Sequence, residues 1–246
     1  MADPVFLITG ASSGIGEATA RHAAEAGYRL VLAARSETKL VDLAEALGGP
    51  DRAIAVRCDV TEWADQEALA KQVLDEFGQI DVAFANAGFG AKRGFLEETP
   101  ELWRDMVLTN VYGAALTVRA TMPALKDSGG HLLLTGSVAG RRAIPGSLYS
   151  CTKWAVTAMG EAVRQELDGT GVRVTVVEPG MVDRPQTADG RPQIAVQAAV
   201  PLSSAHRARP ISSIWPPTRK RVSLPCAGST SMRSSNASST RRGLTP

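Results

Sequence analysis

A tyrosine and a lysine four residues apart form the pattern in this sequence with the clearest chemical meaning. Tyr149 and Lys153 lie in the segment YSCTK, where a helix is predicted to begin, and residues four apart share one face of a helix. A phenol with a reference pKa of about 10 is a poor acid or base at neutral pH. A nearby ammonium favours the phenolate and moves that pKa toward the working range. The pair alone is common by chance and is also consistent with a solvated lysine beside a packed tyrosine.

Two further polar residues extend this set. Ser137 directly follows an apolar run, twelve positions before Tyr149, and its hydroxyl can donate to a developing oxyanion. Asn110 stands within the apolar stretch VLTNVYGAAL, so its amide needs buried hydrogen-bond partners. Taken singly, these are an ordinary loop serine and an ordinary structural asparagine. Together with Tyr149 and Lys153 they form a candidate set for proton transfer to a carbonyl.

A glycine-rich turn indicates where a phosphate would bind. The segment TGASSGIG places Gly10, Gly14 and Gly16 between a predicted strand and a predicted helix. Glycines allow a sharp turn and close approach of the backbone to a pyrophosphate, and the helix start offers free N–H groups to that anion. The spacing G-x-x-x-G-x-G differs from the commonest dinucleotide fingerprint, G-x-G-x-x-G. Such a turn can also bind nothing, so it gains weight only from the other motifs.

The end of the second predicted strand bears on the choice of cofactor. An acidic residue there normally binds the ribose hydroxyls of NAD and repels a 2′-phosphate. This strand instead ends in LAARS, where Arg35 offers a planar fork suited to phosphate and Ser36 adds a hydroxyl. Glu37 and Lys39 make the local charge mixed, and Arg35 is also consistent with a solvated loop residue. The sequence therefore predicts a preference for NADP(H), with NAD(H) possible.

The elements that position these residues alternate along the chain. Strands are predicted at 5–9, 29–34, 53–58, 80–85, 131–136 and 172–177, and helices at 14–26, 37–47, 62–77, 101–126 and 149–167. Apolar strands separated by helices predict an α/β fold, a doubly wound parallel sheet covered on both faces. Ligands of such folds bind beyond the carboxyl ends of the strands, where the residues above fall.

Composition narrows the class of protein. The chain has 246 residues, 44% hydrophobic and 21% charged, which is ordinary for a globular protein that needs neither disulfides nor metals for its core. Its cysteines, Cys58, Cys151 and Cys226, are scattered, so we expect no metal site and a reducing, cytoplasmic location. We expect neither a secretion signal nor a membrane span, because no stretch approaches about 18 consecutive apolar residues.

The last quarter of the sequence has a different character. Residues 1–183 carry a charge balance of −7, whereas residues 184–246 carry +9, with Asp189 as their one acidic residue. We predict a dinucleotide-binding and catalytic domain over 1–183 and an irregular or disordered tail over 184–246. The tail's charge would suit nucleic acid, but it lacks interleaved aromatic residues and any folded nucleic-acid motif, so we expect no nucleic-acid partner.

Taken in order, the motifs resemble those of the short-chain dehydrogenase/reductase family, in its form with a single Rossmann-like domain. They are TGASSGIG, CDVT (58–61), NAG (86–88), Asn110, Ser137, YSCTK and EPG (178–180). The resemblance covers residues 4–183 and stops at Arg184, where the family continues with a substrate lid, a helix and a last strand. Two hypotheses explain this break: a natural disordered extension, or an out-of-frame reading of GC-rich coding DNA. We favour the second, which would give a poorly folded, largely inactive product.

The resemblance implies a role for each matching residue. Tyr149 would be the general acid in carbonyl reduction and the base in the reverse direction. Lys153 would lower the pKa of Tyr149 and bind the nicotinamide ribose, Ser137 would polarise the carbonyl, and Asn110 would hold a water that links Lys153 to solvent. The expected cofactor residues are Gly10, Ser12, Ser13, Gly14, Ile15, Gly16, Arg35, Asp59, Val60, Asn86, Ala87, Gly88, Tyr149, Lys153, Pro179 and Gly180.

The sequence thus predicts an NADP(H)-dependent oxidoreductase that moves a hydride between nicotinamide and a carbonyl or secondary alcohol. Its partners would be a small-molecule substrate and, as is usual in the family, other copies of the same chain. The alternative from another class is a catalytically idle dinucleotide-binding protein that senses redox state or serves as a scaffold. The presence of all four candidate catalytic residues argues against an idle protein.

Overall fold

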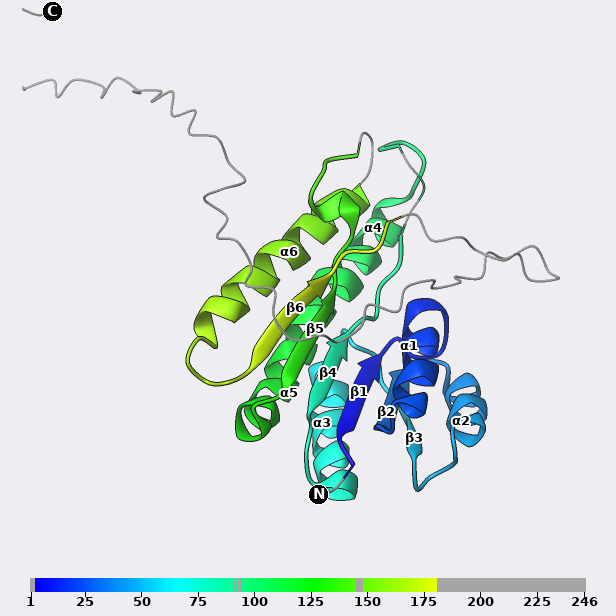
Figure 1. Ribbon diagram of the computed structural model, residues 1–246. Helices are drawn as coiled ribbons and strands as arrows, with labels where there is room; N and C mark the ends of the chain where they lie inside the picture. The colour runs from blue at the N-terminus through cyan, green and yellow to red at the C-terminus, as the bar shows by residue number, and fades with distance from the viewer. Residues whose placement is uncertain (1–2, 91, 93, 145–147, 181–246) are drawn as a thin grey trace, which may run out of the picture. The chain divides into compact units, whose positions relative to one another are not determined.

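Six parallel strands form the single sheet in the part of the chain that the computed structural model describes, residues 3–90, 92, 94–144 and 148–180 (Figure 1). They are β1 (Val5–Thr9), β2 (Arg29–Ala34), β3 (Ala53–Arg57), β4 (Val82–Ala85), β5 (His131–Thr135) and β6 (Arg173–Val177). Their order is β3-β2-β1-β4-β5-β6, with every neighbouring pair parallel. The predicted doubly wound sheet is confirmed, and the predicted tail, 184–246, lies outside the described residues.

Helices cover both faces of this sheet. They are α1 (Gly14–Glu25), α2 (Glu37–Ala46), α3 (Trp63–Phe77), α4 (Pro100–Val107), α5 (Ala114–Ser128) and α6 (Leu148–Glu166). Side chains alternate along a strand, so Leu7 of β1 packs in the cluster shared with α3, α5 and α6, whereas Ile8 packs in the cluster shared with α1 and α2. Burial on both faces explains why the central strands are continuous apolar runs.

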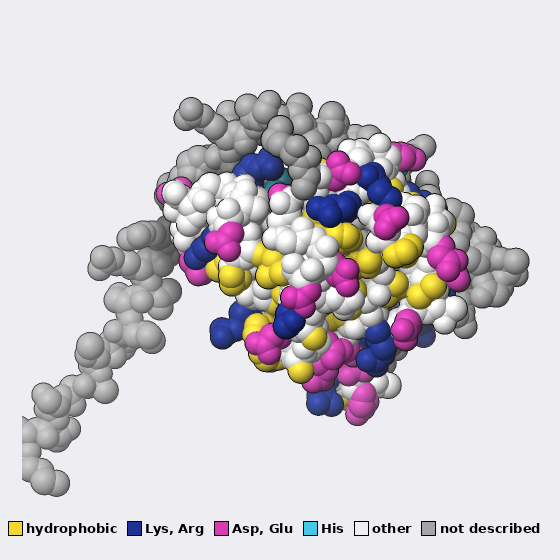
Figure 2. All heavy atoms as spheres, turned by 90° about the horizontal axis from the view of Figure 1, so that it is seen from below, with side chains coloured by type: hydrophobic (Ala, Val, Ile, Leu, Met, Phe, Trp, Pro, Cys, Tyr) yellow, Lys and Arg dark blue, Asp and Glu magenta, His cyan; other side chains and the backbone are white. Residues whose placement is uncertain are grey.

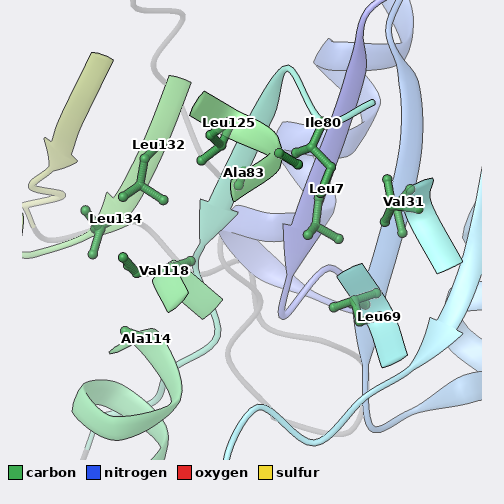
Figure 3. Close-up of a cluster of buried hydrophobic side chains, with 14 of the residues drawn as sticks. Leu7, Val31, Leu69, Ile80, Ala83, Ala114, Val118, Leu125, Leu132 and Leu134 are labelled. Atoms are coloured by element: carbon green, nitrogen blue, oxygen red, sulfur yellow. The ribbon is translucent and has the colours of Figure 1, made fainter. Parts of the chain in front are cut away.

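The larger core cluster lies between the sheet and the three helices α3, α5 and α6. Leu7, Val31 and Leu134 reach it from three strands, while Leu69 of α3 and Leu125 of α5 meet them from the helices (Figure 3). These leucines are at most 1% exposed, and Val31 is fully buried. This packing fixes the strand ends relative to one another, which a site built from several strand ends requires.

The predicted single helix over 101–126 is two α-helices joined by a π-helical segment, Leu108–Gly113. Asn110 lies in this segment, and its side-chain amide bonds both backbone groups of Phe89, at 2.9 Å each. A π-helical turn accommodates an extra residue within a helix and is often found at functional sites. The spacing of apolar residues at intervals of three and four does not reveal one inserted residue. The sequence therefore predicted an uninterrupted helix.

Strand β6 is one of the two outer strands of the described sheet, and β3 is the other. Val174 and Val176 pack against the core cluster that includes α6, while Arg173 and Thr175 are exposed. Helix α6 approaches β6 closely at Gly160, where a β-carbon would lie 2.2 Å from Cγ2 of Val176. This glycine sets the depth at which α6 rests on the sheet, and α6 carries Tyr149 and Lys153.

The surface where the strands begin mixes charged and apolar groups. Figure 2 looks at this end of the molecule and shows acidic and basic side chains interspersed among apolar ones. The ion pairs between Arg21 and Glu17 and between Lys71 and Asp75 join residues one helical turn apart. None of the described helices is both long enough and apolar enough to cross a membrane.

Candidate active site

A cavity of about 320 Å³ opens where five strands end. Its lining follows β1, β2, β3, β4 and β5 in turn and ends on the first residues of α6. The lining residues are Gly10, Ser12, Ser13, Ile15, Ala34, Arg35, Ser36, Cys58, Asp59, Val60, Asn86, Ala87, Gly88, Phe89, Gly90, Thr109, Thr135, Tyr149 and Lys153. The glycine-rich turn and the Tyr149–Lys153 pair, predicted separately, therefore share one cavity.

The glycine-rich turn is packed too tightly for side chains. A β-carbon on Gly16 would lie 2.3 Å from the carbonyl oxygen of Gly10, and one on Gly10 would lie 2.8 Å from Cα of Ala87. Gly10 and Gly14 have φ angles of +67° and +60°, a region that favours glycine. The backbone of the turn therefore reaches the cavity directly. The first N–H groups of α1 lack helical acceptors and suit an anion at this point.

A threonine and an asparagine tie three strand ends together beneath the turn. The Thr9 hydroxyl donates to the carbonyl of Phe84 (3.1 Å) and accepts from the backbone N–H of Asn86 (3.0 Å). The Asn86 amide donates to the Thr9 carbonyl (2.9 Å), and its oxygen accepts from the Thr135 hydroxyl (3.0 Å). Asn86 was predicted at the cofactor, but Thr9 was missed. The sequence feature that could have identified Thr9 is its place as the one polar residue at the end of the apolar run VFLIT, which the structure buries completely.

The charged rim of the cavity is formed by residues that follow β2 and β3. Partial burial raises the pKa of the Asp59 carboxyl, but two hydrogen bonds from Thr61 and the charge of Arg35 outweigh it and hold this pKa below its usual value. Asp59 is therefore ionised at neutral pH. It is the one acidic residue among the described residues that line the cavity, where Arg35 and Ser36 also lie.

Lys153 is buried beside the ring of Tyr149. Its residue is 4% exposed, and Nζ lies 5.7 Å from the ring centroid of Tyr149. Nζ donates to the backbone carbonyl of Thr135 at 2.7 Å, which fixes the ammonium at the end of β5. Burial lowers the pKa of Lys153 to about 8. The sequence predicted the pair from its spacing but not the Thr135 carbonyl, because that partner is a backbone group 18 positions away.

Asn110 lies behind the cavity wall rather than in it. The residue is 2% exposed, and beyond its two bonds to Phe89 its amide donates to the Thr152 hydroxyl at 3.1 Å. Gly88 lies between Asn110 and Lys153, because a β-carbon there would be 2.9 Å from Oδ1 of Asn110 and 3.7 Å from Nζ of Lys153. The geometry brings Asn110 close to Lys153, while its expected role of holding a water stays a prediction.

Ser137 begins a short 3₁₀ turn, Val138–Gly140, between β5 and α6. The residue is 7% exposed, and its hydroxyl accepts from the backbone N–H of Ala139 at 3.1 Å. The N–H of Val138 donates to the Pro179 carbonyl at 3.1 Å, which joins the turn to the segment after β6. The predicted site residues that do not line the cavity are Gly14, Gly16, Asn110, Ser137, Pro179 and Gly180. The residues that line it without having been predicted for the site are Ala34, Cys58, Phe89, Gly90, Thr109 and Thr135.

Among the described residues, no three His, Cys, Asp or Glu side chains cluster closely enough to hold a metal ion. The site is instead a glycine-rich turn, a buried lysine and a tyrosine at the carboxyl edge of a parallel sheet with the strand order of Rossmann folds. The sequence pattern of the short chain dehydrogenase family matches residues 4–194, and the chain belongs to this family. The match continues past Arg184, where the motif resemblance ended, and stops at residue 194.

Individual proteins agree with this assignment. An uncharacterized oxidoreductase of Staphylococcus epidermidis is 36% identical over 187 residues, which cover 75% of this chain and 80% of that protein. Among solved structures, an alcohol dehydrogenase of the archaeon Thermococcus sibiricus, complexed with 5-hydroxy-NADP, is 35% identical with a TM-score of 0.69, covering 79% of this chain and 83% of that one. A short-chain dehydrogenase/reductase of Burkholderia phymatum in complex with NAD is 34% identical, also with a TM-score of 0.69, covering 74% of this chain and 66% of that one.

Proposed function

We propose that the protein is an NADP(H)-dependent oxidoreductase that transfers a hydride between nicotinamide and a carbonyl or secondary alcohol. One observation carries the proposal: a single cavity runs from the glycine-rich turn to Tyr149 and Lys153. The turn, in which Gly10 and Gly16 leave no room for a side chain, fits a pyrophosphate. Asp59 and Val60 would lie at the adenine, and the segment from Asn86 to Gly88 would form the wall beside the adenosine.

The bound nicotinamide would supply or accept the hydride. In carbonyl reduction the Tyr149 hydroxyl gives its proton to the carbonyl oxygen, and in the reverse direction the Tyr149 phenolate takes the proton from the alcohol. The ammonium of Lys153, fixed by the Thr135 carbonyl, stabilises that phenolate. Ser137 donates a hydrogen bond to the carbonyl oxygen as charge develops on it. Asn110 holds a water through which Lys153 exchanges protons with solvent.

The test of this mechanism is Tyr149→Phe, which keeps the ring but removes the transferable proton. The wild-type chain is first screened against ketones, aldehydes and hydroxy acids by nicotinamide absorbance. On the best substrate we expect Tyr149→Phe to lower kcat by about 10²- to 10⁴-fold, the usual contribution of general acid–base catalysis, while cofactor affinity in fluorescence titration is kept. Tyr28→Phe, a phenol packed on Phe6 away from the cavity, is the matched control and should leave kcat unchanged.

Two outcomes would contradict the mechanism. Near-normal turnover by Tyr149→Phe would remove the tyrosine from its proposed role. Cofactor binding without turnover of any substrate in the screen would favour the alternative class, an idle dinucleotide-binding protein. Lys153→Met is a further test of the mechanism. The proposal expects this variant to weaken both turnover and cofactor binding.

The preference for NADP(H) is supported by Arg35 and Ser36, which line the cavity at the end of β2, where no acidic residue ends the strand. The acidic residue of the lining, Asp59, follows β3 instead. The Thermococcus neighbour is complexed with 5-hydroxy-NADP and the Burkholderia neighbour with NAD, so structures of related chains contain either kind of dinucleotide. We expect Arg35→Ala to lower the ratio of kcat/KM for NADPH over NADH by about tenfold or more, since bonds to charged groups contribute about 1.5–3 kcal/mol. Lys39→Ala, a neighbouring cation outside the lining, is the control. An unchanged ratio in Arg35→Ala contradicts the preference.

The proposal also covers the cellular location of the enzyme and its assembly state. Free Cys58 and Cys151 support a reducing, cytoplasmic location, and membership of the family supports a homo-oligomer acting on a small molecule. Light scattering on the purified chain measures the assembly. The out-of-frame origin of residues 184–246 stays a hypothesis, and its test is the gene itself: another frame after codon 183 should encode a helix and a β-rich last strand.

A further inference from the structure

We propose that Ser150 is a positioning residue that holds the Ser137 hydroxyl at a constant separation from the Tyr149 hydroxyl. Ser150 follows Tyr149 directly on α6, and its hydroxyl bonds the turn that carries Ser137. The inference rests on the proposed function, because it assigns Ser150 a part in placing the substrate carbonyl. Ser150 was not among the residues that the sequence marked as functional.

The hydrogen bonds run from Ser150 to Ser137 through one intermediate residue. The Ser150 hydroxyl donates to the carbonyl of Ala139 at 2.7 Å and accepts from the N–H of Ile144 at 3.3 Å. The N–H of Ala139 in turn donates to the hydroxyl of Ser137 at 3.1 Å. Ser150 is 4% exposed and Ala139 is 1% exposed, so water does not compete easily for these bonds.

The turn also rests directly on the backbone of α6. A β-carbon on Gly140 would lie 2.6 Å from the carbonyl oxygen of Lys153, so the turn and the helix are in contact without an intervening side chain. The Ser150 hydroxyl adds a direct hydrogen bond between residues 137–141 and α6. Removing it leaves the contact but frees the turn to shift along the helix.

The opposite side of the turn is held by the segment that ends β6. The N–H of Gly136 donates to the Val177 carbonyl at 2.7 Å, and the Arg141 guanidinium pairs with Glu178 at 2.6 Å. These bonds fix the turn to the sheet edge. The same Glu178 oxygen also accepts from the Thr157 hydroxyl of α6, but this bond is long, at 3.4 Å, and lies two helical turns beyond Tyr149. Ser150 therefore supplies the direct link, next to Tyr149 itself, between the two groups that must meet one carbonyl oxygen.

This link matters because the two hydroxyls act on the same atom. Ser137 has to donate a hydrogen bond to the carbonyl oxygen at the moment Tyr149 gives it a proton, so their separation must be constant. A misplacement of about 1 Å can cost on the order of 10² in rate. Since Tyr149 and Ser150 are adjacent on one helix, a bond from Ser150 to the Ser137 turn sets that separation.

The experiment uses the full chain and the variant Ser150→Ala. We expect kcat to fall by about ten- to a hundredfold, with the KM for the cofactor unchanged, because the glycine-rich turn is not affected. Amide exchange at residues 138–140, measured on the cofactor-free protein, should become about tenfold faster as one hydrogen bond is lost. Ser128→Ala is the matched control: it removes a hydroxyl bond of the same length, 2.7 Å to the Ile80 carbonyl, at the other end of the sheet. It should change neither measurement.

A second variant tests whether Ser150 acts through Ser137. If it does, Ser137→Ala combined with Ser150→Ala should have the same kcat as Ser137→Ala alone. Losses that multiply, or a normal kcat in Ser150→Ala when Ser137→Ala is impaired, overturn the inference. If the wild-type chain turns over no carbonyl at all, the proposed function fails, and the exchange measurement then decides alone. Unchanged exchange at residues 138–140 overturns the anchoring role of Ser150.

Discussion

Mild acid should destabilise the fold through His131, at the start of β5. The residue is 8% exposed, and its Nε2 lies 2.9 Å from the Thr175 hydroxyl of β6. Burial, and then the charge of Arg173 opposite it in register, lower the pKa of His131 from 6.5 to about 4. Between these values the unfolded chain binds a proton at this imidazole and the folded chain does not. The free energy of unfolding therefore falls as the pH drops below 6.5.

The size of the effect follows from the width of this window. Each unit of pKa difference corresponds to about 1.4 kcal/mol, so the contribution lost by pH 5 is about 2 kcal/mol, and by pH 4 about 3 kcal/mol. Urea unfolding at pH 7.5 and pH 5 measures it for the wild type and His131→Gln, which cannot titrate. The glutamine variant should lose about 2 kcal/mol less between the two pH values than the wild type does.

Other groups that titrate in this range are common to both proteins, so the difference between them isolates His131. His22→Gln is the control, since the His22 side chain is 68% exposed, and it should show the wild-type pH dependence. Equal losses in the wild type and His131→Gln, within about 0.5 kcal/mol, would refute the reasoning, because measured extrapolations carry an uncertainty of about 10–15%. The conclusion would then be that the imidazole is protonated in the folded chain.

Three more perturbations follow from the geometry. Gly16→Ala should weaken cofactor binding at least about tenfold in fluorescence titration, since its methyl would lie 2.3 Å from the Gly10 carbonyl and distort the phosphate turn; normal affinity would contradict this. The pKa of Lys153, about 8, predicts that kcat/KM falls as pH rises through that value, and a pH profile unchanged in Lys153→Arg would argue against the assignment. Gly160→Ala should cost about 1–3 kcal/mol of stability by crowding Val176, measured by urea unfolding; wild-type stability would show that α6 can shift.

Much of the fold was predictable because its signals are local. A run such as residues 5–9 is apolar throughout because the strand is buried on both faces, and each predicted strand agrees with the structure within two residues at either end. The π-helical segment at Leu108–Gly113 was not predictable in this way. It depends on Asn110 bonding the backbone of Phe89, 21 positions earlier, and no spacing within the helix reports such a contact.

In the candidate site too, the residues with local sequence patterns were predicted and those defined by tertiary contacts were not. The glycine-rich turn and the Tyr149–Lys153 pair have short-range patterns, and the structure brings both to one cavity. The partners that hold them in place were missed, because Thr135 acts through its backbone carbonyl and Ser150 through a bond to a turn eleven positions away. A backbone acceptor leaves no mark in the residue types, so tertiary contacts had to be seen before these groups could be named.

The bonds between Thr9 and Asn86 have a consequence for how the chain folds. These residues are 77 positions apart, and β4 reaches its place beside β1 only after β2 and β3 have left the ribosome. The binding cavity therefore does not exist on a nascent chain that holds only the first three strands. A cofactor present at about 100 times its dissociation constant would stabilise the folded chain by about 2.7 kcal/mol, but only once β4 has docked. Binding of the proposed cofactor would thus stabilise the two halves of the sheet together, and would give no help to the first half on its own.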